Sequence, residues 1–493
     1  MSPTSSLHDL VDPGAEAVAT YAARGYAEDV LPVRPHDRTW STPQFVTVWM
    51  GPIHNILSYF TVVGFFALGL SARQVVAAIL LSAVIVSAGY VLNGQASARY
   101  GVPFAMLLRD SFGSRGALIP AAIRGTVAGI VFFGLSTVSS AQALDVVMDK
   151  VFPGYADLDG SVLGLAVPTA ISYLLMWAIT VALFLAGQRF LGRFSTWANP
   201  AVYVLIVVGV VLAVRNVGSF SDVFELHPVQ SEVTPLVFVG CVAALVSNWA
   251  GPIVNTGDYT RNATSTKAPA LGFPVGVIAS YLLFALVTVS FMASLSVSTH
   301  GDFDVNRPTI FVDAINSIGN PFVVVLLILS MNVGMTAFCV FGNMLPAGLQ
   351  LTAEWPSRFT VRNGAIITAV VGTLFLPWKF LEATDALFLF YSFIGSMFGP
   401  IAGIMLASYF VERRRTVDLD DIYADPRSPQ VAYNWRAIGV LVVSFVFTMT
   451  GTLPGLEEID FLVDVKNLAF FSGLLIGFVG YTLTILSTRE ATS

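Results

Sequence analysis

Long apolar segments recur along almost the whole chain, and they constrain its fold more than any other feature. A window of about 20 mostly apolar residues is long enough to cross the hydrocarbon core of a bilayer. The 493-residue sequence is 55% hydrophobic and only 11% charged, which is far more apolar surface than one soluble core can bury. We therefore predict an all-α polytopic membrane protein with twelve transmembrane helices, at 43–69, 73–96, 118–148, 163–187, 195–214, 233–255, 270–297, 309–345, 362–381, 385–411, 436–453 and 467–487.

The distribution of basic residues predicts how these helices are oriented. Of the 25 Lys and Arg residues, 19 fall on the side of the N-terminus and 6 on the other. Because cytoplasmic loops are enriched in Lys and Arg, both termini are expected in the cytoplasm of a cell (inner or plasma) membrane protein. Residues 1–42 show no cleavable signal peptide and are expected to form a flexible cytoplasmic tail. Residues 412–435 are expected to be a cytoplasmic loop, and residues 488–493 a C-terminal tail.

Charged residues are scarce in the centres of the predicted spans. Those inside spans lie near predicted ends, where side chains reach the interface: Arg124, Asp145, Asp313, Glu382 and Asp385. Since an unpaired charge in lipid is costly, any ligand bound at mid-membrane is expected to be neutral. Cys241 and Cys339 both fall inside spans, which indicates packing residues rather than a disulfide. The net charge of −6 does not indicate nucleic-acid binding.

Two Gly-Pro pairs interrupt the first and the sixth apolar segments. They lie in "VWMGPIHNILSY" at 48–59 and in "SNWAGPIVN" at 247–255. Proline removes a backbone donor and displaces a carbonyl, so the freed groups need protein, water or a ligand as partners. This pattern is typical of a secondary transporter with two inverted five-helix repeats, here 43–214 and 233–411, followed by two further helices at 436–487. Ordinary proline kinks are the alternative, and the spacing alone does not decide.

Three further blocks of sequence resemble a known transporter family. They are "YGVPFAMLLRDSFGSRGALIP" at 100–120, "FTVRNGAIITAVVGTLFLPWKF" at 359–380, and "GPIAGIMLASYFVERRRTVDLDDIY" at 399–423 followed by "NWRA" at 434–437. The blocks resemble the nucleobase:cation symporter-1 family, the purine/cytosine permease and hydantoin transporter group. The resemblance implies a LeuT-like five-plus-five fold with broken helices 1 and 6. It also implies symport of a neutral nitrogen heterocycle, such as cytosine, uracil, a purine, allantoin or hydantoin, with Na+ or H+.

The resemblance also implies a substrate site. Trp249 matches the tryptophan on which the substrate ring stacks. Phe132 falls on the second stacking position if one residue is inserted early in the third helix, and without that insertion the match is Val131. The polar edge of the site would be formed by Asn343, Asn248, Asn55 and Ser136. Amides offer donors and acceptors, which suits a ring with alternating N–H and C=O groups.

The implied cation site departs from the sodium-coupled pattern. Its ligands would be the carbonyls of Gly51, His54 and Val333 and the hydroxyl of Thr336, while a second hydroxyl position is occupied by Ala337. Losing one oxygen ligand weakens the binding of a hard cation such as Na+. His54 is the only histidine within a predicted span, so a titrating role in proton coupling is an alternative, against that of a neutral hydrogen-bond partner.

The sequence fits a transporter better than an enzyme or a channel. An integral-membrane enzyme needs clustered acids, histidines or a nucleophile with its base at membrane depth, and the spans lack such a cluster. A channel is built from a symmetric ring of pore segments, which the two asymmetric breaks do not provide. A transport-inactive receptor or scaffold remains open from sequence. We expect a monomeric carrier with no organic cofactor, and no role for the last two helices follows from their sequence.

Overall fold

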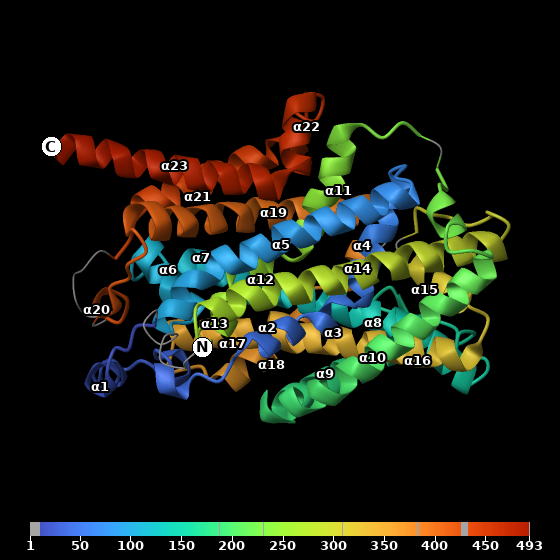
Figure 1. The fold of residues 1–493 in the computed structure, drawn as a ribbon, viewed down its shortest axis with the longest axis horizontal. Helices are drawn as coiled ribbons and strands as arrows, with labels where there is room; N and C mark the ends of the chain where they lie inside the picture. Colours follow the sequence, from blue (N-terminus) through green and yellow to red (C-terminus); the bar gives the residue numbers. More distant parts are fainter. Residues whose placement is uncertain are drawn as a thin grey trace.

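The computed structural model describes residues 10–186, 188–229, 231–307, 309–381, 384–424 and 432–492. Long helices lying side by side form most of the described chain (Figure 1). Its one hairpin pairs β1 (Ser161–Val162) with β2 (Leu165–Ala166). Eight described helices are long and apolar enough to cross a membrane. Four shorter apolar helices, Ile56–Ala67, Val202–Val217, Pro235–Asn248 and Val361–Leu374, complete the predicted twelve, so the all-α polytopic prediction is confirmed.

The helix bounds follow the predicted spans closely. The first five segments are α2 (Thr42–Thr47), α3 (Met50–Ile53) and α4 (Ile56–Ala67), then α5 (Ala72–Tyr100), then α7 (Leu118–Ala121), η5 (Ala122–Ala128) and α8 (Gly129–Val151), then α9 (Val167–Ala186), then α10 (Gln188–Val217). The next five are α11 (Pro235–Asn248), α12 (Ala250–Val254) and α13 (Gly257–Thr260), then α14 (Lys267–Ser298), then α16 (Pro321–Phe338), η7 (Cys339–Met344) and α17 (Leu345–Glu354), then α18 (Val361–Leu374), then α19 (Thr384–Ala407) with η9 (Ser408–Glu412). The last two are α21 (Trp435–Met449) and α23 (Ala469–Thr492).

Short helices join these segments at the two ends of the bundle. Figure 1 places α1 (Ala15–Ala23), α6 (Phe104–Phe112) and α20 (Leu419–Ile422) at one end, with the C-terminal end of α23. The other end carries α15 (Ile310–Asn316) and α22 (Asp460–Asn467). The remaining short elements are η3 (Glu28–Val30), η4 (Pro35–Asp37), η6 (Asp222–Glu225), η8 (Pro377–Leu381) and η10 (Thr450–Thr452).

The predicted bounds of the eighth span, 309–345, are wrong. Residues 310–316 form the separate helix α15, and the membrane segment runs from Pro321 to Glu354. Asn320 caps its start, because the Asn320 side chain accepts a hydrogen bond from the Val323 amide at 3.2 Å and proline occupies the first helical position. The residues that start α16 therefore separate two apolar segments, which hydrophobic composition alone does not distinguish.

The prediction of a flexible N-terminal tail is wrong for residues 10–41, while residues 1–9 lie outside the described chain. Tyr21 stacks on Tyr423 with ring centroids 4.7 Å apart, and the Tyr423 hydroxyl donates to the Val30 carbonyl at 2.6 Å. Arg38 is buried and donates to the Ala98 carbonyl at 2.6 Å. A few buried aromatic and apolar residues are enough to fix this polar segment across the helix ends.

The last helix packs backbone to backbone on α19. A Cβ atom added at Gly399 would lie 2.4 Å from the Phe470 carbonyl oxygen, and one at Gly403 would lie 2.3 Å from that of Leu474. Small residues at such positions let two helices approach closely. The two C-terminal helices are thereby fixed to α19, and the loop helix α22 lies near the end of α11 (Figure 1).

Candidate functional site

The first transmembrane segment is broken at residues 48–55. The chain leaves helical geometry at His54 (φ −83°, ψ 45°) and is extended at Asn55 (φ −93°, ψ 146°) before α4 begins. Asn55 caps α4, because its Oδ1 accepts from the Ser58 amide at 2.8 Å. Its Nδ2 donates to the Pro52 carbonyl at 2.6 Å and to Ser58 Oγ at 2.9 Å. The Asn55 amide, which the sequence predicts at the edge of the ligand, therefore bonds other groups of the first segment in this structure.

The sixth segment is broken in a closely related way. Trp249 separates α11 from α12, and Asn255 (φ −96°, ψ 22°) separates α12 from α13. The pattern W-x-G-P-I-x-N occurs at 49–55 and again at 249–255, and this extended repeat was a sequence signal beyond the two Gly-Pro pairs. The rings of Trp49 and Trp249 meet edge to face with centroids 5.6 Å apart, so the two breaks lie against each other.

The indole of Trp249 is enclosed by aromatic side chains. Trp249 is 1% exposed, and its ring contacts Phe338 at 5.4 Å and Tyr281 at 6.4 Å between centroids as well as Trp49. Phe132 is also buried, and it packs edge-on against Phe390 of α19 at 5.3 Å. The two predicted stacking rings thus contact different partners, and a ligand reaches the indole only when its neighbours move.

Buried polar atoms without strong partners lie beside the breaks. Asn248 Nδ2 donates to Ser58 Oγ at 3.0 Å, but Asn248 Oδ1 has no hydrogen-bond partner among the described residues. Ser136 and Asn343 lie against the Cys339 thiol, a weak hydrogen-bonding group, and within the described chain Ser136 Oγ and Asn343 Nδ2 have no stronger partner. A buried polar atom left unsatisfied costs about 1–3 kcal/mol, so these atoms favour a bound ligand or water.

Ser58 is a residue that the sequence interpretation missed. Its hydroxyl accepts from both Asn55 of the first break and Asn248 of the sixth, and so it joins the two breaks. The available sequence signal was the position of Ser58, three residues after Asn55. The backbone N–H at that position commonly donates to the side chain of the N-cap residue.

The predicted cation ligands from the first break face the eighth segment. A Cβ atom added at Gly334 of α16 would lie 2.5 Å from the Gly51 carbonyl oxygen and 3.3 Å from that of His54. Both oxygens are therefore directed at the stretch that contains Val333, Thr336 and Ala337. The Thr336 hydroxyl donates to the Asn332 carbonyl at 2.8 Å, and this leaves its oxygen lone pairs for another group.

His54 is surrounded by aromatic rings rather than by carboxylates. Its Nδ1 lies 2.8 Å from the Tyr59 hydroxyl, and its ring meets Tyr203 edge to face at 5.1 Å and Phe284 at 6.3 Å. The residue is fully buried. Charging an imidazole in such surroundings is costly, so the geometry favours a neutral hydrogen-bond partner over a titrating group.

Arg124 corrects an expectation from sequence, because it does not reach the interface. It lies in the π-helical turn η5, is 1% exposed, and donates from Nη2 to Asn255 Oδ1 at 2.9 Å and to the Gly342 carbonyl at 2.8 Å. Asn255 Nδ2 in turn donates to Asp258 Oδ2 at 2.9 Å. The position of Arg124 near the end of a predicted span indicates exposure, whereas in the structure the sixth and eighth segments cover this side chain. Glu382, another predicted end residue, lies outside the described residues.

These features are those of one class of protein: a helical membrane carrier built around two broken helices. A family model described as permease for cytosine/purines, uracil, thiamine, allantoin matches residues 32–480. The chain belongs to this family, so it is a multi-pass transport protein and not an enzyme.

Named relatives and solved structures agree with this assignment. The chain is 36% identical to the putative allantoin permease of Escherichia coli (strain K12), covering 94% of this chain and 95% of the relative. It is 31% identical to the allantoin permease of Bacillus subtilis (strain 168), covering 92% of each. Mhp1, a nucleobase-cation-symport-1 family transporter solved in a closed conformation with bromovinylhydantoin bound, matches with a TM-score of 0.77 at 20% identity, over 94% of this chain and 96% of Mhp1. This likeness confirms the predicted LeuT-like fold with two additional C-terminal helices.

Proposed function

We propose that this permease carries a small neutral nitrogen heterocycle across the membrane together with a cation, by alternating access. One observation carries the proposal: two broken helices meet at Trp49 and Trp249, next to the unsatisfied Asn248 Oδ1. In this account, residues 43–214 and 233–411 are the two inverted repeats, and the helix bundle rocks around the breaks. The protein acts as a monomer in the cell (inner or plasma) membrane with both termini in the cytoplasm.

Allantoin and related ureide rings are the first candidate substrates. Two relatives above 30% identity carry allantoin in their names. The ring would stack on Trp249, with Phe132 on the second face after the helices rearrange. Asn248 Oδ1 would accept from a ring N–H, Asn343 Nδ2 would donate to a ring C=O, and Ser136 would add a hydroxyl. Asn55 positions Ser58 and Asn248 rather than touching the ring.

We assign the coupling ion to the gap between the first break and α16, with Na+ as the first candidate. The carbonyls of Gly51 and His54 lie against α16 at Gly334, and the Thr336 hydroxyl and the Val333 carbonyl would complete the set. Ala337 supplies no oxygen, so the affinity for Na+ is low. The aromatic surroundings of His54 disfavour a proton as the coupling ion.

Uptake into proteoliposomes tests the proposed function. Wild-type protein should accumulate labelled allantoin, hydantoin or uracil in a saturable, Na+-gradient-dependent manner. Trp249→Ala should abolish saturable uptake, because it removes the stacking surface. Trp355→Ala is the matched control, since that indole is 42% exposed and lies far along the chain from the breaks.

The same assay separates the alternatives. Binding without uptake by the wild type would indicate a receptor or scaffold rather than a carrier. Uptake that a pH gradient drives, and that a Na+ gradient leaves unchanged, would replace Na+ with H+. Saturable uptake that survives Trp249→Ala would contradict the assigned substrate site.

A further inference from the structure

A cavity lies beside α11, on the N-terminal side of the sixth-helix break. It has a volume of about 450 Å³ and is formed by α4, α11, α19 and α22. Ligand sites for small molecules commonly have volumes of about 300–1,000 Å³. Figure 1 places α11 and α22, which line the cavity, away from α1 and α20, so the cavity lies toward the end of the bundle opposite the N-terminal helix. It therefore lies on the expected external face of the permease.

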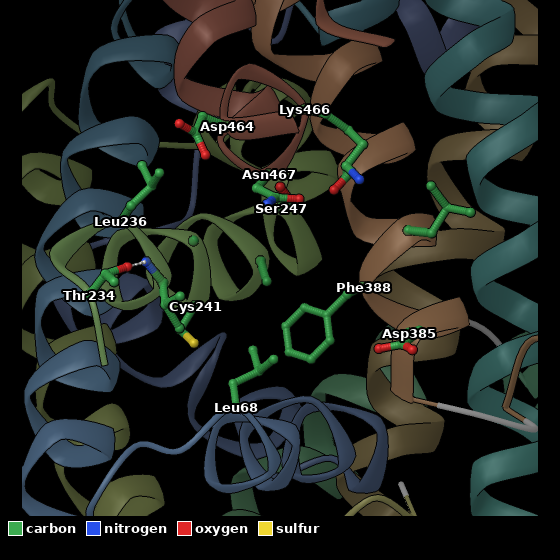
Figure 2. Close-up of a pocket in the computed structure, with 15 residues that line it drawn as sticks. Leu68, Thr234, Leu236, Cys241, Ser247, Asp385, Phe388, Asp464, Lys466 and Asn467 are labelled. Atoms are coloured by element: carbon green, nitrogen blue, oxygen red, sulfur yellow. Dashed lines mark hydrogen bonds between the residues drawn. The ribbon is translucent and has the colours of Figure 1, made fainter. Parts of the chain in front are cut away.

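The lining combines an apolar wall with polar groups of both hydrogen-bonding senses. Figure 2 shows Phe388 of α19 and Leu68, the residue after α4, directed into the same space. Asp464, Lys466 and Asn467 of α22 border the cavity from another side, and Asp385 stands one helical turn before Phe388. A ring N–H can donate to the carboxylates, while a ring C=O can accept from the ammonium or the amide.

The charged groups of this lining are not used to hold the fold together. In the described parts of the chain, neither Asp464 nor Lys466 forms an ion pair, and the same is true of Asp385. Lys466 and Asp464 lie on one short helix, two residues apart. Polar side chains that face a cavity and have no protein partner are available to a solute that enters it.

The inner end of the cavity adjoins the central site without opening into it. Ser247, on the last turn of α11, lines the cavity and precedes Asn248 and Trp249. A Cβ atom at Gly395 of α19 would lie 2.7 Å from Ser247 Oγ, so α11 and α19 are in close contact at this point. Ser247 lies two residues before Trp249 along the chain, so separation of α11 from α19 would connect the cavity to the enclosed indole.

We propose that this cavity is an outer binding site for the same heterocyclic substrates, an inference that rests on the proposed function. The ring packs on Phe388 while its polar edge bonds Asp464 and Asn467. This site gives the two C-terminal helices a role, because α22 joins them and supplies the polar side of the cavity. The close packing of α23 on α19 holds that side in register with Phe388. The occupant then passes to Trp249 when α11 and α19 part.

Equilibrium binding of labelled allantoin to purified protein tests this proposal. The wild type should bind with two classes of affinity, a tight class at Trp249 and a weak class in the outer cavity. Trp249→Ala should remove the tight class and leave the weak one. Asp464→Asn removes the negative charge of the acceptor, and Phe388→Ala removes the ring contact. Each should weaken the weak class by roughly fivefold and leave the tight class unchanged.

Matched variants control for indirect effects. Asp460→Asn changes an acid on the same helix α22 that does not line the cavity, and Phe393→Ala changes a ring of α19 that faces Phe445 instead. Both controls should bind as the wild type does. Asp464 and Phe388 are partly exposed, so their variants should fold, and an unchanged melting temperature would verify this.

The outcomes separate this inference from the proposed function. A single class of binding that Trp249→Ala removes and Asp464→Asn leaves unchanged would keep the proposed function and overturn the outer site. Equal effects of Phe388→Ala and Phe393→Ala would also overturn it, as would a weak class displaced by detergent or lipid alone, which would identify the cavity as an acyl-chain groove. No binding of allantoin, hydantoin, uracil or cytosine to the wild type would overturn both.

Discussion

The segments Trp49–Asn55 and Trp249–Asn255 share the pattern W-x-G-P-I-x-N, and both breaks start from a tryptophan with φ −101°. They diverge at the asparagine. Asn55 is extended and caps the next helix, whereas Asn255 stays near helical geometry and accepts from the buried Arg124. One motif therefore yields two conformations, and what packs against the asparagine decides which.

The difference supports the proposal that the two breaks hold different ligands. The first break turns the carbonyls of Gly51 and His54 toward α16, which suits a cation. The sixth break carries the indole and the unsatisfied amide oxygen, which suit a planar polar ring, and it is held from behind by a guanidinium. The following substitutions test whether the two breaks have these different roles.

Removing Arg124 should have the largest effect, and it should act on the sixth break and the adjoining part of the eighth segment. Arg124→Ala leaves the Asn255 Oδ1 and Gly342 carbonyl without their donor and leaves the buried Asp258 with Arg261 but without the second positive charge near it. Breaking a buried charge network costs about 3–5 kcal/mol. The melting temperature in detergent should fall sharply, and the yield of folded protein with it.

A surface arginine provides the matched control for that change. Arg73→Ala removes an exposed partner of Glu225 and should alter stability by less than about 1 kcal/mol. Combining Arg124→Ala with Asp258→Asn should restore part of the lost stability, because the carboxylate no longer needs a counter-charge. Equal melting temperatures for Arg124→Ala and the wild type would show that the guanidinium does not support the break.

Gly334→Ala should disturb the first break with a smaller effect. The added methyl would lie 2.5 Å from the Gly51 carbonyl oxygen, so α3 and α16 must separate. Overpacking of this kind costs typically about 1–3 kcal/mol, and the displaced carbonyls should raise the Na+ concentration that half-saturates uptake. Gly342→Ala is the control, because its methyl would meet only the Phe338 ring at 3.4 Å. Unchanged Na+ dependence in Gly334→Ala would remove the cation from this gap.

The existence of both breaks and the depth of Trp249 could be predicted from the sequence, because proline chemistry is local. The contacts of Asn55 and Arg124 could not be predicted from the sequence. The sequence predicts Asn55 as a ligand amide and does not reveal that its side chain caps α4. It places Arg124 near the end of a span, although the sixth and eighth segments cover this side chain. Both depend on contacts between segments far apart in the sequence. The repeated W-x-G-P-I-x-N pattern, by contrast, was fully visible.

Asn55→Ala should have a moderate effect on stability and a weak effect on ligand binding. Loss of a helix cap costs about 0.5–2 kcal/mol, and Ser58 would lose one of its two amide donors. Thermal denaturation with and without allantoin measures both terms. A complete loss of allantoin binding, with no change in the melting temperature of the ligand-free protein, would show that Asn55 contacts the substrate ring directly.

The smallest expected change is a gain. Ala337→Thr restores a second hydroxyl oxygen beside Thr336 and should lower the half-saturating Na+ concentration for uptake severalfold. Ala337→Val is nearly isosteric with the threonine and lacks the hydroxyl, so it should not reproduce the gain. If both variants behave alike, position 337 does not face the ion.

The most direct test of the division between the breaks is a thermal-shift matrix on purified protein. Allantoin and Na+ are each titrated against the wild type, Trp249→Ala and Thr336→Val, because a ligand that binds only the native state raises its melting temperature. Trp249→Ala should lose the allantoin shift and keep the Na+ shift, and Thr336→Val should lose the Na+ shift. Retention of both shifts in both variants would contradict the account.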